Sequence, residues 1–231
     1  VIDCGLSFPE DEMYGVDLVI PDITYLTNNA HKVKGIFLTH GHEDHIGAVP
    51  YILKQLNVPV FGTKLTLGIV ENKLQSHNML SDCTLNCVEP GETVTTGSFK
   101  IEFIRVTHSI ADSCAIALHT PAGVVLHTGD FKVDYTPIDG LTMDLERISS
   151  LGREGVLLLM ADSTNVERQG HSISESSIGG TLERIFANAD GRIIVATFAS
   201  NIHRMQQIIN ASVINRRKIA FSGRSMEDIS R

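Results

Sequence analysis

The 231 residues are 42% hydrophobic and 20% charged, a composition typical of a globular chain with a sizeable core. Apolar runs such as residues 155–161 are far shorter than the ~20 residues that cross a bilayer, so we expect neither a transmembrane span nor a membrane partner. None of the four cysteines forms a CxxC pair, which favours reduced thiols and a cytoplasmic protein over a disulfide scaffold.

Charge is distributed unevenly along the chain. Residues 1–174 carry 11 Lys and Arg against 22 Asp and Glu, and residues 175–231 carry 8 against 5, so the net charges are −11 and +3. This asymmetry is compatible with a partner surface on the basic side and, equally, with ordinary variation between solvated faces. The first residues have neither an initiator Met nor a charged leader, so we expect the chain to begin inside a strand of a longer protein.

Short strands separated by turns are expected over the first part of the chain. The apolar runs predict strands at 35–39, 58–61, 84–88, 100–106, 114–118 and 124–127. Polar and apolar residues alternate in 100–106, a pattern typical of a half-buried antiparallel strand. Helices are expected between some strands, including one whose apolar face begins at Ile46. Together these elements predict a sheet-on-sheet core with helical covers.

The pattern changes after the apolar run 155–161. Ser172 and Glu175 form a capping-box signature before a helical face at 178–189, and a second helix is expected from about Asn201. Strands are expected at 192–198 and 218–221, which gives a βαβ unit of a doubly wound parallel sheet. We therefore expect one domain over 1–174 and the start of a second, incomplete domain over 175–231.

The strongest chemical signal lies where the strand 35–39 ends. His40 and His42 are at alternate positions and can face one side, while Asp44 and His45 lie where the next helix begins. Three histidines and an aspartate within six residues are denser than solvation explains. Imidazole with carboxylate is zinc-type ligation, although Mn²⁺ is also compatible, and the two pairs suit two ions. For Asp44, a helix N-cap is the alternative role.

Further candidates are residues that follow other strands. His108 comes after the strand 100–106, and Asp130 comes after 124–127. Alone, each would more often be a cap or turn residue, but together with the cluster they complete a plausible ligand set. Asp3 is a candidate carboxylate that orients a ligand histidine from behind.

In its spacing, this ligand set resembles that of the metallo-β-lactamase superfamily. The resemblance implies an αββα sandwich with a dinuclear zinc site between the sheets. It implies that His40, His42 and His108 hold one zinc. It also implies that Asp44 and His45 hold the second zinc and that Asp130 bridges the two.

Longer stretches, among them 127–132, 161–165, 197–204 and 223–226, resemble the ribonuclease J family of β-CASP nucleases. The resemblance implies a doubly wound domain inserted in the lactamase-like domain, and Asp162 matches the group's first acidic motif, with a catalytic role. It also implies 5′–3′ exonuclease and endonuclease activity in RNA processing and decay, and a homo-oligomer or a hetero-oligomer with a paralogue. The family pattern extends beyond both ends of this chain and includes a further histidine of the second zinc site, which leaves the activity of these 231 residues alone open.

Three residues at the start of the expected helix near 201 are candidate RNA contacts. Ser200 and Asn201 suit a phosphate cradle, since helix N-termini present free amides, and are equally compatible with a simple helix cap. Arg204 suits a contact to the RNA backbone, with an ion pair inside the domain as the alternative.

Three other functions remain compatible with parts of the sequence. A small-substrate hydrolase of the same superfamily would share the ligands but lack the βαβ unit. A silent scaffold subunit of a ribonuclease complex would be expected to have lost ligands, and here all of them are present. A DNA-directed β-CASP nuclease is disfavoured by the stretches that resemble ribonuclease J.

Overall fold

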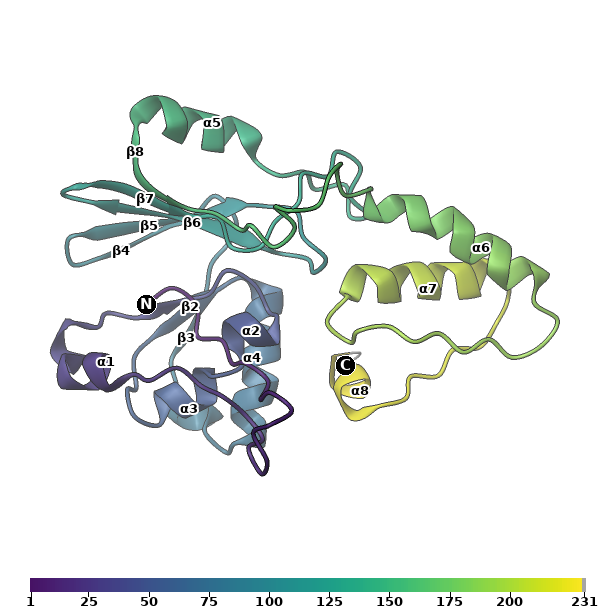
Figure 1. The fold of residues 1–231 in the computed structure, drawn as a ribbon, viewed down its shortest axis with the longest axis horizontal. Helices are drawn as coiled ribbons and strands as arrows, with labels where there is room; N and C mark the ends of the chain where they lie inside the picture. The colour runs from purple at the N-terminus through teal and green to yellow at the C-terminus, as the bar shows by residue number, and fades with distance from the viewer. Residues whose placement is uncertain (230–231) are drawn as a thin grey trace.

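The computed structural model describes residues 1–229, and its first part is built in four layers (Figure 1). One sheet is covered by α1 (Thr24–Asn28), α2 (Glu43–Ile46), α3 (Val49–Leu53) and α4 (Lys64–Ser76). A second sheet packs on the first, and α5 (Leu145–Glu154) covers its outer face. This is the expected αββα sandwich, so the predicted fold class is confirmed.

The two sheets differ in strand direction. The three-stranded sheet is parallel and consists of β1 (Ile36–Phe37), β2 (Val60–Gly62) and β3 (Leu85–Cys87). The five-stranded sheet consists of β4 (Thr93–Thr96), β5 (Phe99–Arg105), β6 (Cys114–Thr120), β7 (Gly123–His127) and β8 (Val156–Met160). β4 to β7 are antiparallel and β8 joins β7 in parallel. Short 3₁₀ turns occur at Ala30–Lys32, Leu80–Asp82 and Glu175–Ile178.

The period-two alternation of strand side chains builds the layers. In β1, Ile36 packs toward the helices, while Phe37 points to the other sheet, where its ring stacks on Phe61 at 4.8 Å. In β5, Phe103 faces the first sheet and Ile104 packs under α5. Alternate residues of one strand therefore stabilise two different interfaces.

The helix expected from Ile46 is broken into α2 and α3. Pro50 lies in the first turn of α3, where its missing N–H costs nothing, and its ring disfavours helical continuation from the preceding turn. Ile46, Val49 and Leu53 are nevertheless all buried in the same cluster. The apolar pattern was thus informative about burial and less so about helix continuity.

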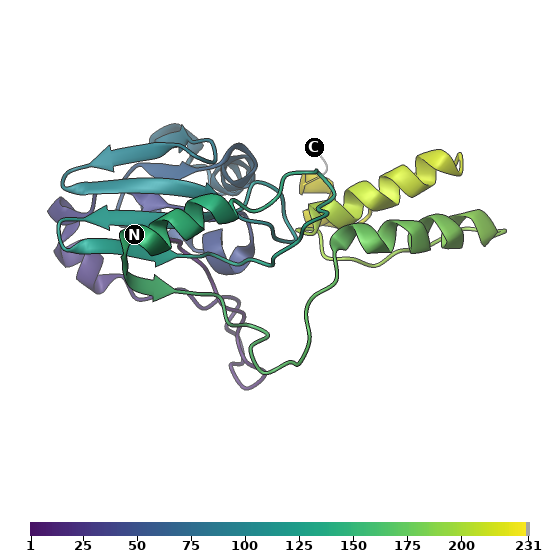
Figure 2. The ribbon, with the colours of Figure 1, turned by 90° about the horizontal axis from the view of Figure 1, so that it is seen from above.

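The C-terminal part consists of helices, which extend away from the sandwich (Figure 2). α6 (Gly179–Asn188) packs on α7 (Ile202–Ile214), and α8 (Arg224–Ile229) follows. The strands expected at 192–198 and 218–221 are a wrong prediction for this structure, because neither segment is a strand. The two helices were correctly predicted.

The reason is the absence of a ladder partner. Strand structure requires hydrogen bonds to a neighbouring strand, and within the described chain 192–198 and 218–221 make none. The first segment is instead adjacent to the Arg217 side chain, which donates hydrogen bonds to the carbonyl oxygens of Phe186, Ala189 and Gly191. Phe198 is 84% exposed, although a central strand of a doubly wound sheet would bury it.

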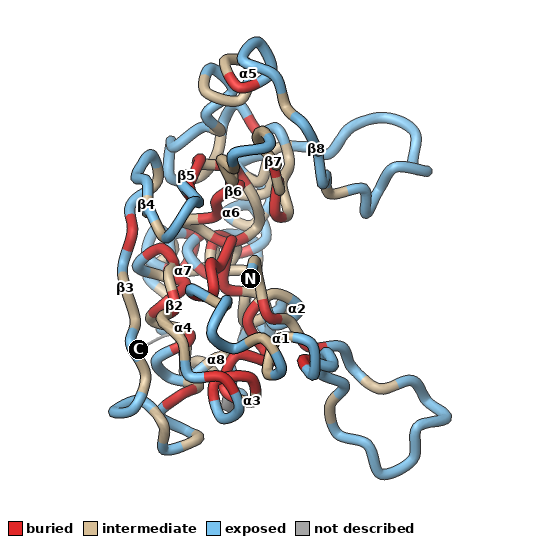
Figure 3. Tube along the Cα trace, turned by 90° about the vertical axis from the view of Figure 1, so that its left-hand side faces the viewer, coloured by how far each residue is buried: buried red, intermediate tan, exposed pale blue. Residues whose placement is uncertain are grey.

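Burial is concentrated in and around the two sheets, and the loop that follows β8 is exposed along most of its length (Figure 3). The described helices include none with the length and apolarity needed to span a bilayer.

Candidate metal centre

The candidate site lies where β1 ends and α2 begins. His40 is completely buried, and His42 is extended, with φ −77° and ψ 153°, directly before the first residue of α2. Gly41 separates them at a close approach, because a Cβ there would lie 2.7 Å from Cδ1 of Ile69. A side chain at this position would therefore displace the end of the Ile69 side chain, which packs beside the site.

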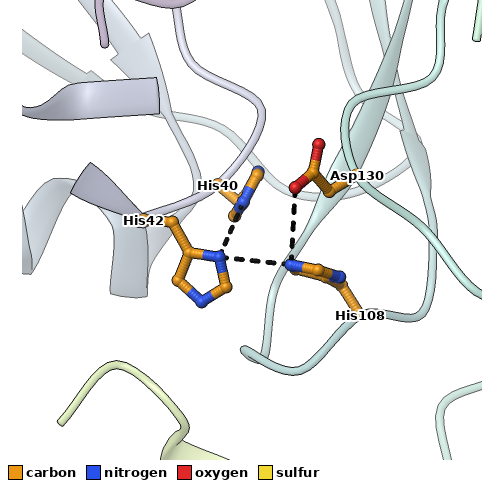
Figure 4. Close-up of side chains that lie close together, drawn as sticks. All are labelled: His40, His42, His108 and Asp130. Carbon is orange, nitrogen blue, oxygen red and sulfur yellow. Dashed lines mark hydrogen bonds and ion pairs between the residues drawn. The ribbon is translucent and has the colours of Figure 1, made fainter. Parts of the chain in front are cut away.

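The first group of side chains is centred on Nδ1 of His42 (Figure 4). This atom lies 3.1 Å from Nε2 of His40 and 3.2 Å from Nε2 of His108. Nε2 of His108 lies 3.9 Å from Oδ2 of Asp130. His108 follows β5 and Asp130 follows β7, so the second sheet delivers two side chains to a histidine pair delivered by the first.

A second group shares Asp130. Nε2 of His45 lies 3.3 Å from Oδ1 of Asp130 and 3.6 Å from Oδ2 of Asp44. The two oxygens of Asp130 therefore face different groups. Asp44 is not the N-cap of α2, a position held by His42; it lies in the first turn with its side chain 69% exposed.

Asp3 lies behind His45, on the side away from Asp130. Its Oδ2 is 2.7 Å from Nδ1 of His45 and accepts a hydrogen bond from the Thr39 hydroxyl, while its Oδ1 accepts one from the Thr39 amide. These contacts direct Nε2 of His45 toward the second group. Gly5 lets the chain pass, since a Cβ there would lie 1.6 Å from the Asp44 carbonyl oxygen.

The electrostatics of the two groups differ. Burial and the neighbouring histidines lower the pKa of His40 to about 2, and burial lowers that of His108 to about 4. Burial also acts to lower the pKa of His45, but hydrogen bonds to Asp130 and Asp3 outweigh it and raise the pKa to about 10. The hydrogen bond from His45 in turn lowers the pKa of Asp130 to about 2. At neutral pH the first group therefore presents neutral imidazoles to an ionised carboxylate.

The donor set fits divalent metal ions. Two nitrogen ligands that are ~2.1 Å from a tetrahedral ion lie about 3.4 Å apart, close to the 3.1 and 3.2 Å separations around His42. Within each group the ligand atoms lie within 4.8 Å of one another. The first group consists of His40, His42, His108 and Asp130, and the second of Asp44, His45 and Asp130. In the first group, neutral imidazoles with an ionised carboxylate are the protonation states that a metal requires, whereas the His45 ring of the second group would have to release a proton to bind one.

Other predicted site residues lie at different places. Asp162 follows β8, and its Oδ1 accepts hydrogen bonds from the amide and hydroxyl of Thr164. It is close enough to His108 to raise that residue's pKa, although burial dominates. Asp162 thus borders the first group without belonging to it.

The three predicted RNA contacts lie at the start of α7. The Asn201 side chain caps the helix by accepting a hydrogen bond from the Arg204 amide at 3.0 Å, which is the alternative role stated for it. The Arg204 side chain lies 2.9 Å from Oε2 of Glu175, which is the ion pair stated as its alternative. Burial lowers the pKa of His42, and the Ser200 backbone is among the weaker influences that act to raise it, so this turn lies near the site.

Two residues next to the candidate metal site, Thr39 and Lys132, were not assigned a role from the sequence. Thr39 is completely buried and contacts Asp3, and its hydroxyl is 3.0 Å from Nδ1 of His40. Lys132, two residues beyond Asp130, is 2.8 Å from Oε1 of Glu175. In the sequence, only their positions close to a ligand residue could have indicated a role for Thr39 or Lys132, and such a position is weak evidence.

Comparison with known families agrees with this geometry. The model of the metallo-β-lactamase superfamily matches residues 1–142, and the chain belongs to that superfamily. Membership implies that the site binds divalent metal ions. Residues 190–231 match the family described as Ribonuclease J, beta-CASP domain. The resemblances noted in the sequence are thereby confirmed.

Curated relatives carry the same family name. The chain is 49% identical to "Ribonuclease J" of Synechocystis over 99% of its length, 46% identical to that of Thermus thermophilus over 100%, and 44% identical to "Ribonuclease J2" of Bacillus subtilis over 99%. It spans only 36%, 42% and 41% of those proteins. A solved structure of a protein of unknown function from Enterococcus faecalis superposes on this chain with a TM-score of 0.62 at 19% identity. The superposition covers 90% of this chain and 57% of that one, and it supports the fold alone.

Proposed function

We propose that the full-length protein is a zinc-dependent ribonuclease that hydrolyses RNA phosphodiester bonds, with 5′–3′ exonuclease and endonuclease activity in cytoplasmic RNA processing and decay. The observation that carries the proposal is the convergence of two ligand groups on the two oxygens of Asp130. Such an arrangement suits two metal ions a few ångströms apart, as in nucleases that clamp both sides of a phosphoryl group. The relatives named "Ribonuclease J" support RNA as the substrate.

In this proposal His40, His42 and His108 hold one Zn²⁺, Asp44 and His45 hold the second, and Asp130 bridges them. Mn²⁺ is the alternative ion, since imidazole and carboxylate suit both. Bound ions would supply Lewis-acid activation of water and of the phosphodiester. We assign Asp162 a catalytic part at the border of the site, where its charge acts on His108.

The surrounding protein has a separate task, the binding of the RNA backbone. Residues 1–174 form the lactamase-like domain in this proposal and 175–231 the start of the β-CASP domain, whose net charge of +3 suits RNA. Ser200, Asn201 and Arg204 lie at the start of α7, beside the metal site, and would contact phosphates there. We expect the full-length protein to act as a dimer or tetramer, or together with a paralogue.

The proposal is tested with the full-length protein on 5′-labelled monophosphorylated RNA and matched DNA. Two zinc ions per chain are expected, with cleavage of RNA in preference to DNA. Less than one metal per chain at saturating zinc, without chelator, would remove the mechanism. Preferred cleavage of DNA would indicate the repair-nuclease alternative.

The matched variant is Asp44→Ala. Its side chain is 69% exposed and caps no helix, so the substitution should cost little stability. We expect cleavage to fall by at least 10³-fold, because catalytic metals supply several kcal/mol of transition-state stabilisation, while RNA affinity changes little. Near-native turnover of Asp44→Ala would contradict the proposed role.

A further inference from the structure

Two segments of the second sheet carry ligand candidates, and they are not neighbours in that sheet. His108 lies on the segment that follows β5, and Asp130 on the segment that follows β7. Since β6 lies between β5 and β7, strand spacings of about 4.8 Å place these two strands about 10 Å apart. Nε2 of His108 nevertheless lies 3.9 Å from Oδ2 of Asp130 (Figure 4). Beyond the strand ends, this approach depends on contacts between the two segments.

The contacts between the segments come from the backbone and the side chain of Thr107. The Lys132 amide donates a hydrogen bond to the Thr107 carbonyl oxygen at 2.8 Å, and the Thr107 hydroxyl donates one to the Lys132 carbonyl oxygen. The Asp134 amide donates to the same hydroxyl at 3.4 Å. In the described chain, each hydrogen bond between residues 106–113 and 128–136 involves Thr107. One residue therefore ties the His108 segment to the Asp130 segment.

The Thr107 hydroxyl is buried and uses both of its hydrogen-bonding capacities. Thr107 is only 6% exposed. A threonine hydroxyl has one proton to donate and lone pairs that accept, and here it does both toward the backbone of one segment. Because a buried carbonyl or amide without a partner costs free energy, removing the hydroxyl favours movement of that segment away from Thr107. Thr107 directly precedes His108, so such a movement changes the separation of the two ligand candidates.

We propose that Thr107 is a positioning residue that fixes the His108 imidazole relative to the Asp130 carboxylate, through its hydrogen bonds to Lys132 and Asp134. The inference rests on the proposed function in taking His108 and Asp130 as metal ligands. Asp130 belongs to both ligand groups, so a displaced Asp130 segment should weaken the binding of both metal ions. A side chain outside both groups thus controls metal affinity.

The test compares Thr107→Val with Thr107→Ser in the full-length protein, with metal affinity as the readout. Valine keeps the branched shape without the hydroxyl, and serine keeps the hydroxyl without the methyl group. Loss of an outer hydrogen-bonding partner typically weakens metal affinity by 10- to 100-fold, and we expect about 10-fold for Thr107→Val because the effect reaches the ligands through the backbone. Thr107→Ser should bind metal as the wild type does. Competition with a chelator measures the affinity.

The Co²⁺-substituted protein gives a second readout, because its d–d absorption spectrum depends on the geometry of the ligands. The spectrum should change in Thr107→Val and stay that of the wild type in Thr107→Ser. A loss of stability alone would leave the spectrum of the folded protein unchanged.

The matched control is Thr120→Val, at the end of β6. The Thr120 hydroxyl likewise donates to a carbonyl oxygen, that of Gly123 at 2.8 Å, and accepts from an amide, that of Ala122 at 3.1 Å. The other end of β6 is at Cys114, whose amide donates to the Thr39 carbonyl beside the site. Thr120 is therefore about 20 Å from that end of the strand. Thr120→Val should bind metal as the wild type does.

If Thr107→Val does not fold, Thr107→Ala removes the hydroxyl without placing a methyl group against the Lys132 carbonyl, and it should give the same loss of affinity. Metal affinity and Co²⁺ spectra equal to wild type in the folded variant that lacks the hydroxyl would overturn the inference. A Thr107→Ser variant that loses as much affinity as Thr107→Val would overturn it as well. A wild-type protein that binds no metal would instead overturn the proposed function.

Discussion

At the scale of single residues, the site depends on contacts that orient ligands as much as on the ligands themselves. Asp3 is the clearest case, since its carboxylate contacts the His45 ring at 2.7 Å and both polar groups of Thr39. Its backbone has φ 55°, a conformation that aspartate and asparagine tolerate better than other side chains. Both the identity of this residue and its conformation are therefore constrained.

We expect Asp3→Ala to weaken metal binding by about 10- to 100-fold, because His45 loses the partner that holds its Nε2 toward Asp130. Chelator competition on the full-length protein measures this change. Asp22→Ala serves as the control, as Asp22 is an exposed carboxylate whose hydrogen bonds come, within residues 1–229, from Thr24. Equal metal affinity for Asp3→Ala and Asp22→Ala would exclude an orienting role.

The ligand candidates could be found from sequence because they lie at strand ends, where alternation and spacing specify direction. His40 and His42 are two positions apart and both follow a strand. The structure brings them together with His108 and Asp130. The role of Thr39 was not predictable, since a buried threonine beside a ligand has the same local signature as an ordinary strand residue. Its partner Asp3 is 36 positions away, and only the pairing of the first residues with β1 brings the two together.

At the scale of elements, α5 is fixed to the second sheet by apolar packing and by one ionic contact. Glu102 of β5 faces α5, where it lies 2.5 Å from Nε of Arg147, and it also contacts His119 of β6 at 2.9 Å. Hydrogen bonds from Arg147 are the main cause that keeps the pKa of Glu102 below its ordinary value. A carboxylate whose folded pKa is lowered stabilises the fold above its unfolded pKa, and that stability is lost as pH falls through the folded pKa.

We expect Glu102→Gln to lower the free energy of unfolding by about 1–2 kcal/mol at pH 7, a value for a partly screened hydrogen-bonded charge. The difference from wild type should shrink as the pH falls below about 4.3, the ordinary glutamate pKa. Urea unfolding at several pH values measures it, with Glu71→Gln at an exposed position of α4 as control. A destabilisation that stays constant down to pH 3 would indicate lost packing instead of lost charge.

Elements whose partners are local were predicted better than elements whose partners are distant. α6 and α7 make their own hydrogen bonds and were found from their apolar faces. The segment 192–198 has the composition of a central strand, yet Ile194 is 89% exposed and no ladder forms in the described chain. Strand propensity shows only that a segment suits a sheet, and a neighbouring strand must supply the other half of the structure.

At the scale of the whole molecule, charge and position act together. The −11 of residues 1–174 includes carboxylates of the site, whose charge bound metal ions would offset, while the +3 of residues 175–231 lies in the C-terminal part. In the Glu175 cluster the cations Lys132 and Arg204 face two carboxylates, Glu175 and Asp134, so the formal charges of the cluster cancel. An RNA phosphate entering here would therefore compete with Glu175 for the Arg204 side chain.

The consequence is measurable at Arg204. If Arg204 contacts a phosphate, Arg204→Ala in the full-length protein should weaken binding similarly for all RNA sequences and lower the slope of log affinity against log salt by about one. If its only task is the ion pair with Glu175, the stability of the protein falls while the salt slope stays at the wild-type value. Measuring RNA affinity at several salt concentrations, together with urea unfolding of both proteins, separates the two roles. An unchanged slope with unchanged affinity would remove Arg204 from the RNA path and leave it as the ion-pair partner of Glu175.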